Sequence, residues 1–78
     1  MPIDDRVLET LSQSGLTLTP AVIAYNIDKS REEVTRRLSV LVEQGLVKRE
    51  KRGYYSIEGP GEAYLRGDAD LRDEDRPT

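Results

Sequence analysis

Residues 30–45 read SREEVTRRLSVLVEQG, and this segment predicts a helix with both ends capped and one apolar face. Ser30 and Glu33 have the spacing of a capping box, in which the hydroxyl accepts from the Glu33 amide and the Glu33 side chain reaches back. At about 100° per residue, the apolar stripe of this helix consists of Val34, Leu38, Leu41 and Val42. Gly45 supplies a left-handed residue at the C-terminal end. The opposite face, around Arg36, is therefore expected to be exposed.

A hairpin follows this helix directly. Residues 46–50 and 54–57 are strand-like and flank a turn that ends in Gly53, a residue suited to a positive φ. Alternation along the second strand points Tyr55 and Ile57 toward the core and leaves Tyr54 partly exposed. We call this hairpin the wing.

Positive charge is concentrated on the helix and the wing. Residues 29–52 contain eight Lys or Arg and four Asp or Glu, a net charge of +4. The rest of the chain contains four Arg and eleven acids, a net charge of −7, which gives the total of −3. A basic unit in an otherwise acidic protein is what a phosphate-binding surface requires.

The N-terminal part predicts a helix over residues 4–13. Its apolar face consists of Val7, Leu8 and Leu11. Residues 16–18 alternate over too short a distance to stand alone, and predict a short edge strand or an extended connector.

A second helix is predicted over residues 20–26, because Thr19 is a good N-cap and Pro20 suits the first helical position. The side chains that it offers to the core are Val22, Ile23 and Ile27. A turn at residues 28–29 separates it from the helix that begins at Ser30. Two short capped helices at this distance have a helix-turn-helix spacing.

The C-terminal part predicts one more helix and a tail. Residues 58–61 break the sheet, and a short helix over residues 62–66 ends at Gly67. This helix can bury Ala63 or Tyr64, and Leu65. Residues 68–78 contain five acids, two Arg and one Leu, which predicts a disordered acidic tail. The expected organisation is a folded domain over residues 1–67 and a tail over residues 68–78.

The element order predicts an α+β, mostly α, fold with a three-helix core, a two- or three-stranded wing and a short C-terminal helix. The strings that carry a narrower likeness are TPAVIAYNID at residues 19–28, SRE at 30–32, RRL at 36–38, QGLV at 44–47 and GYYSI at 53–57. In these the chain resembles the small haloarchaeal winged helix-turn-helix proteins similar to the repressor of phage phi-H. The resemblance covers roughly residues 4–67 and implies sequence-specific DNA binding by a transcriptional regulator, often as a dimer.

Composition excludes several functions and indicates a habitat. The chain of 78 residues has no Cys and no His, which removes thiolate nucleophiles, imidazole bases and the usual zinc ligand sets. We therefore expect no enzyme, no metal and no cofactor.

The longest apolar run is residues 21–24, and no signal peptide precedes it, so a cytoplasmic location is expected. Fifteen acids, with only three Lys among twelve basic residues, favour a halophilic source over chance in a GC-rich genome.

The candidate DNA contacts lie on the third helix and the wing, and each has a purely structural alternative. Ser30 and Arg31, at the helix start, suit backbone contacts. Arg36 has the reach for a bidentate contact with guanine, Thr35 or Ser39 suit bases or phosphate, and Glu32 suits a cytosine amino group. The alternative is a solvated helix face with pairs such as Glu32–Arg36 and Glu33–Arg37.

The predicted wing contacts with DNA are Lys48, Arg49, Lys51 and Arg52. They suit a phosphate track or the minor groove. Their alternative function is to prevent edge-to-edge pairing of strands.

Together these features predict a double-stranded DNA-binding transcriptional regulator, in particular a repressor. One such domain reads only a half-site, so a homodimer is expected, with the first or last helix at its interface. No small-molecule ligand is indicated. The alternative is a protein-interaction module that uses Tyr25, Tyr54 and the last helix without binding DNA.

Overall fold

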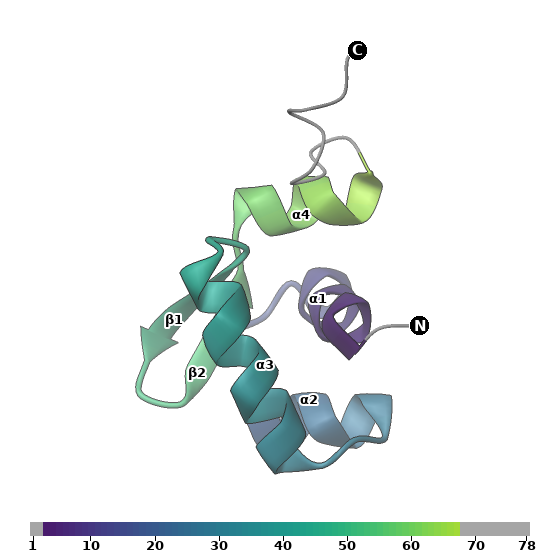
Figure 1. The fold of residues 1–78 in the computed structure, drawn as a ribbon, viewed down its shortest axis with the longest axis vertical. Helices are drawn as coiled ribbons and strands as arrows, with labels where there is room; N and C mark the ends of the chain where they lie inside the picture. Colours follow the sequence, from purple (N-terminus) through teal and green to yellow (C-terminus); the bar gives the residue numbers. More distant parts are fainter. Residues whose placement is uncertain (1–2, 68–78) are drawn as a thin grey trace.

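The computed structural model describes residues 3–67 and contains four helices and one hairpin (Figure 1). In chain order the elements are α1 (Ile3–Ser14), α2 (Pro20–Ile27), α3 (Arg31–Glu43), β1 (Val47–Lys51), β2 (Tyr54–Ile57) and α4 (Gly59–Arg66). The predicted tail at residues 68–78 lies outside the described residues. None of the described helices combines the length and apolar character that crossing a membrane needs. The element order is that of a winged helix-turn-helix, as predicted.

Helices α1, α2 and α3 pack against one another pairwise and enclose a single core. The core side chains are Val7, Leu8, Leu11, Ile23, Ala24, Ile27, Val34, Leu38, Leu41, Leu46, Val47 and Tyr55. Helix α4 packs on α1, while the wing packs on two helices, β1 on α3 and β2 on α1 (Figure 1). The three helices thus enclose one core, as expected, although Val42 is only partly buried at its margin and Val22 lies outside it.

The helix ends are fixed by the side chains that the sequence predicts. Thr19 Oγ1 accepts a hydrogen bond of 3.3 Å from the Val22 N–H, and Ser30 Oγ accepts one of 3.1 Å from the Glu33 N–H. The expected return bond from Glu33 to Ser30 is absent within residues 3–67, so only half of the capping box forms. The turn between α2 and α3 depends on Asp28, whose φ of 62° is left-handed although it is not a glycine.

The wing is an antiparallel pair in which Val47 lies opposite Ile57 and Arg49 opposite Tyr55. A bulge between Arg49 and Lys51 shifts the register, and Gly53 turns the chain with a φ of 80°. Leu18 forms an isolated antiparallel bridge with β2. The Leu18 N–H donates to the Tyr55 carbonyl, and the Tyr55 N–H donates to the Leu18 carbonyl, both at 2.8 Å. The wing is thereby attached to the connector that precedes α2.

Two expectations of the sequence analysis are wrong. Val22 was expected in the core, but its side chain is 44% exposed, and Ala24 takes its place at 5%. Helix α2 has only eight residues, and the face that it turns inward is that of Ile23 and Ile27, which carries Val22 outward.

The second correction concerns α4, which begins at Gly59 rather than at Glu62. Pro60 lies in its first turn, where the missing N–H is not needed for a helical hydrogen bond. Gly61 is buried because the helix passes directly over the carbonyl of Leu46 and the side chain of Ile57. Residues 59–61 therefore form the first turn of α4, in which Gly61 is closely packed and Gly59 is exposed.

Replacing Gly61 by Ala should destabilise the domain by about 1–3 kcal/mol. The added Cβ would meet the Leu46 carbonyl and would lie 2.8 Å from Ile57 Cγ1. Gly59→Ala is the matched control, because a Cβ there meets nothing within 4 Å. Urea unfolding of both variants checks this prediction, and equal stabilities would contradict the close packing of α4 on the wing.

Candidate nucleic-acid interface

The outward face of α3 is the first part of the candidate interface. Because Val34, Leu38 and Leu41 are buried, the opposite side of the helix lies in solvent. Its exposed residues include Arg31, Glu32, Thr35, Arg36, Ser39 and Glu43. The structure thus places every α3 residue predicted to contact DNA on the accessible side of the helix.

The polar groups on this face are engaged to different degrees. The Ser30 hydroxyl is occupied by the N-cap, and Ser39 Oγ donates a hydrogen bond of 3.3 Å to the Thr35 carbonyl. Arg31 and Arg36 form no ion pair within the described part of the chain. The Glu32–Arg36 pair of the alternative interpretation is therefore absent among the described residues, and the Arg36 guanidinium is available to a ligand.

Arg37 pairs with Asp4 of α1, and not with Glu33 as in the alternative of a solvated helix face. Its Nε and Nη2 atoms each donate a 2.8 Å hydrogen bond to one carboxylate oxygen of Asp4. This hydrogen bond, and then the charge of Asp4, raise the pKa of the Arg37 guanidinium. The two side chains are 38% and 25% exposed, so the pair contributes at most about 1 kcal/mol to stability.

The wing is the second part of the candidate interface. Lys48, Arg49, Lys51 and Arg52 are all exposed. Lys48 Nζ lies 3.8 Å from Glu50 Oε1, while Glu50 Oε2 accepts a 2.8 Å hydrogen bond from the Ser56 hydroxyl. The other three cations have no ion-pair partner within residues 3–67.

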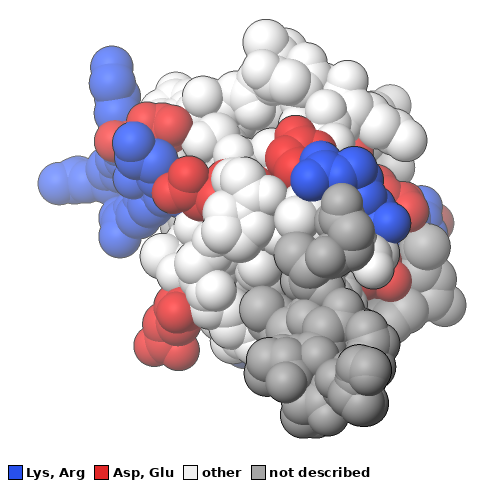
Figure 2. Space-filling view, turned by 90° about the horizontal axis from the view of Figure 1, so that it is seen from above, with Lys and Arg blue, Asp and Glu red and all other residues white. Residues whose placement is uncertain are grey.

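These unpaired cations give the wing a clear position on the surface. Figure 2 shows Lys and Arg side chains projecting from the left edge of the molecule, the side on which Figure 1 places the wing. Since β1 packs on α3, the basic wing and the outward face of α3 belong to one connected unit. This arrangement suits an extended polyanion that contacts a helix and a neighbouring ribbon.

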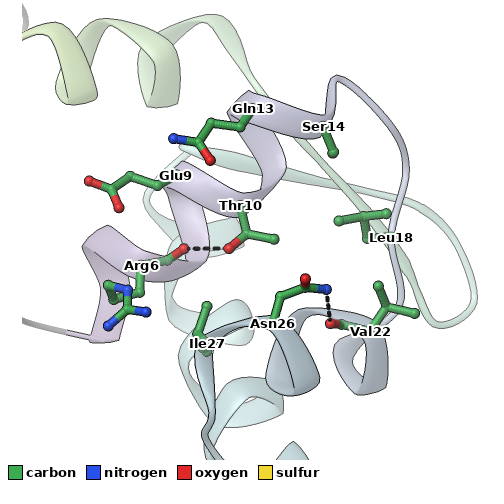
Figure 3. A pocket seen from close by; sticks show the side chains of 9 residues that line it. All are labelled: Arg6, Glu9, Thr10, Gln13, Ser14, Leu18, Val22, Asn26 and Ile27. Carbon is green, nitrogen blue, oxygen red and sulfur yellow. Dashed lines mark hydrogen bonds between the residues drawn. The ribbon is translucent and has the colours of Figure 1, made fainter.

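A groove of about 550 Å³ between α1 and α2 was not anticipated from the sequence. Its lining residues are Arg6, Glu9, Thr10, Gln13, Ser14, Leu18, Val22, Asn26 and Ile27 (Figure 3). Asn26 Nδ2 donates a 2.8 Å hydrogen bond to the Val22 carbonyl, and Thr10 Oγ1 donates one of 2.9 Å to the Arg6 carbonyl. Because the three helices pack pairwise, this groove lies on the side of the bundle opposite the outward face of α3.

The described residues contain no cluster of three or more acidic side chains arranged to hold a metal ion.

Comparison with known proteins gives one positive finding: a family model described as winged helix-turn-helix phage repressor matches residues 1–76. No curated protein and no solved structure matches the chain. The family match spans all four helices and the wing, so it includes both parts of the candidate interface.

Replacing Ser30 by Ala should lower the free energy of unfolding by about 0.5–2 kcal/mol, because the Glu33 N–H loses its acceptor at the start of α3. Ser30→Asp is the control, since an aspartate at the same position retains the cap. Thermal unfolding of both variants is the measurement. An Ala variant as stable as the Asp variant would show that the cap does not hold this end of α3.

Proposed function

This chain belongs to the winged helix-turn-helix phage repressor family, and from this premise we propose that it represses transcription by occupying double-stranded DNA at a promoter. Membership makes it a DNA-binding regulator and places it outside the enzyme families. In the proposed complex α3 lies in the major groove and the wing lies on the backbone. Binding would exclude the transcription machinery sterically.

The observation that carries this proposal is a set of basic side chains on α3 and the wing that have no ion partner among the described residues. The members of this set are Arg31, Arg36, Arg49, Lys51 and Arg52. A protein of net charge −3 leaves these cations exposed on one connected unit, while Arg37 is neutralised by Asp4. Phosphate neutralisation by such cations supplies the sequence-independent part of DNA affinity.

Sequence reading is assigned to the N-terminal half of α3, the part that enters the major groove in helix-turn-helix proteins. Arg36 has the length and the free fork for a bidentate contact with guanine O6 and N7. Thr35 is the better hydroxyl for a base, because the Ser39 hydroxyl already bonds to a helix carbonyl. Glu32 suits a cytosine amino group. Arg31 suits the backbone, and so does Ser30, whose hydroxyl accepts the cap bond and can still donate its proton to a phosphate oxygen.

Positioning is assigned to the wing. Lys51 and Arg52 at its tip suit a phosphate track or the minor groove, and Arg49 supports them. Lys48 contributes less because Glu50 lies 3.8 Å from it. The attachment of the wing to Leu18 keeps these charges at a fixed distance from α3.

Oligomeric state and habitat extend the proposal. A domain of this size covers one half-site, so we expect a homodimer on two half-sites about 34 Å apart, joined through α1 or α4.

The acidic, Lys-poor composition suits a protein that functions in a cytoplasm of high salt, as in haloarchaea. Carboxylates keep such a protein hydrated, while the unpaired cations still bind phosphate.

A second candidate function is a protein-interaction module. Tyr25 on α2 is 87% exposed, and Val22 beside the α1–α2 groove is 44% exposed. These exposed apolar side chains offer a surface to a protein partner. Incubating the purified protein with genomic fragments at several salt concentrations separates the two functions, because a pure interaction module would enrich no fragment.

Replacing Arg36 by Ala should weaken binding to the selected DNA site by about 1–3 kcal/mol and relax preference at one base position. Arg6→Ala is the control, since it removes the same charge from the groove on the opposite side. Fluorescence anisotropy with the selected duplex and its single-base variants measures both effects. Unchanged affinity and preference would remove Arg36 from the reading residues.

Replacing Lys51 and Arg52 together by Gln should weaken all duplexes about equally. It should also reduce the slope of log affinity against log salt by about one to two, because up to two phosphate contacts are lost. Titrations of a selected and a scrambled duplex at three salt concentrations test this. A loss confined to the selected duplex, with the slope intact, would mean that the wing reads bases.

A further inference from the structure

Within residues 3–67, the Asp4–Arg37 pair is the one ion pair that engages a cation of α3. It joins residues 33 apart in sequence through two parallel 2.8 Å hydrogen bonds, the fork geometry that holds a guanidinium in one orientation. Glu33 is one helical turn before Arg37 and is the nearer partner in sequence, yet it is not used. The pairing is therefore a tertiary feature, set by the packing of α1 on α3.

Arg37 lies on the flank of the proposed reading helix. At about 100° per residue it is turned roughly a quarter of the circumference from Arg36, which faces outward. The major groove is about 12 Å wide, so side chains on the flank of a helix inside it face the phosphate walls. An unpaired arginine at this position would add a contact to phosphate that is the same for every DNA sequence.

We propose that Asp4 is a specificity-determining residue, whose carboxylate holds Arg37 away from phosphate and so lowers affinity for DNA of arbitrary sequence. The inference rests on the proposed DNA binding. Specificity is a ratio of affinities, and lowering the non-specific affinity raises that ratio without any new contact to a base. If the pair only held α1 against α3, removal of either partner would have the same effect. In the proposed function the two removals have different effects on DNA binding.

The inequality defines the experiment. Asp4→Asn breaks the fork and frees the cation, while Arg37→Gln breaks the fork and removes the cation. For Asp4→Asn and a random-sequence duplex, the slope of log affinity against log salt should be steeper than that of the wild type by about 0.9. Between 1 M and 0.1 M salt, the affinity of this variant should therefore rise about eightfold more than the affinity of the wild type. Arg37→Gln, and the double variant, should bind this duplex with the wild-type slope.

Glu9→Gln is the matched control, because it makes the same change in net charge on the same helix and Glu9 has no ion partner within residues 3–67. Anisotropy titrations with the random and the selected duplex, at three salt concentrations, compare all five proteins. Thermal melting verifies that each is folded. The Arg37→Gln result tests the inference even where Asp4→Asn melts early, because a shallower slope would show that Arg37 already contacts phosphate.

Three other results would overturn the inference. Equal losses of selected binding in Asp4→Asn and Arg37→Gln, without a change in slope, would make the pair a structural brace. The gain in affinity for the random duplex would be due to net charge alone if it were no larger in Asp4→Asn than in Glu9→Gln. The same conclusion would follow if the double variant retained the gain. A wild-type protein that binds neither duplex at any salt concentration would instead refute the proposed function, and the inference with it.

Discussion

Burial of one stripe on α3 is the constraint on which the rest of this domain depends. Val34 and Leu38 have no exposed surface and Leu41 has 1%, and they contact a core shared by α1, α2 and the wing. Burying this stripe fixes the rotation of α3 about its axis, so the opposite stripe is presented to solvent. The same packing that stabilises the fold therefore decides which α3 side chains are accessible to the proposed DNA partner. Arg36 is among them, because it follows the buried Val34 by two residues and precedes Leu38 by two.

The wing depends on the core in the same way. Two strands alone are marginal in water, but here β1 packs on α3, and Leu18 exchanges two hydrogen bonds with Tyr55 of β2. At the base of the hairpin the Glu58 N–H donates to the Leu46 carbonyl at 3.0 Å. The close passage of Gly61 over that carbonyl adds packing. The wing is thus a rigid extension of the core. Its unpaired cations have a defined relation to α3, which recognition of a rigid duplex needs.

Local sequence patterns predict most of the fold, and tertiary packing determines the features that they do not predict. The caps at Thr19 and Ser30 act over three residues, so the sequence alone predicts where α2 and α3 begin. The start of α4 and the exposure of Val22 depend on which elements meet, and here local patterns failed. For the candidate site, exposure of Arg31 and Arg36 follows from helix periodicity, whereas strand alternation does not predict that Lys48 and Arg49 are both exposed. The Asp4–Arg37 fork spans 33 residues, and only the packing of α1 on α3 reveals it.

The central claim is that α3 and the wing form a single DNA-binding unit. Amide chemical shifts of the protein, followed while a duplex selected from bound genomic fragments is added, test it most directly. The account predicts the largest changes in residues 30–39 and 48–52, with the α1–α2 groove little affected. Changes centred on Arg6 and Tyr25, or none at either end of the α3–wing unit, would contradict it.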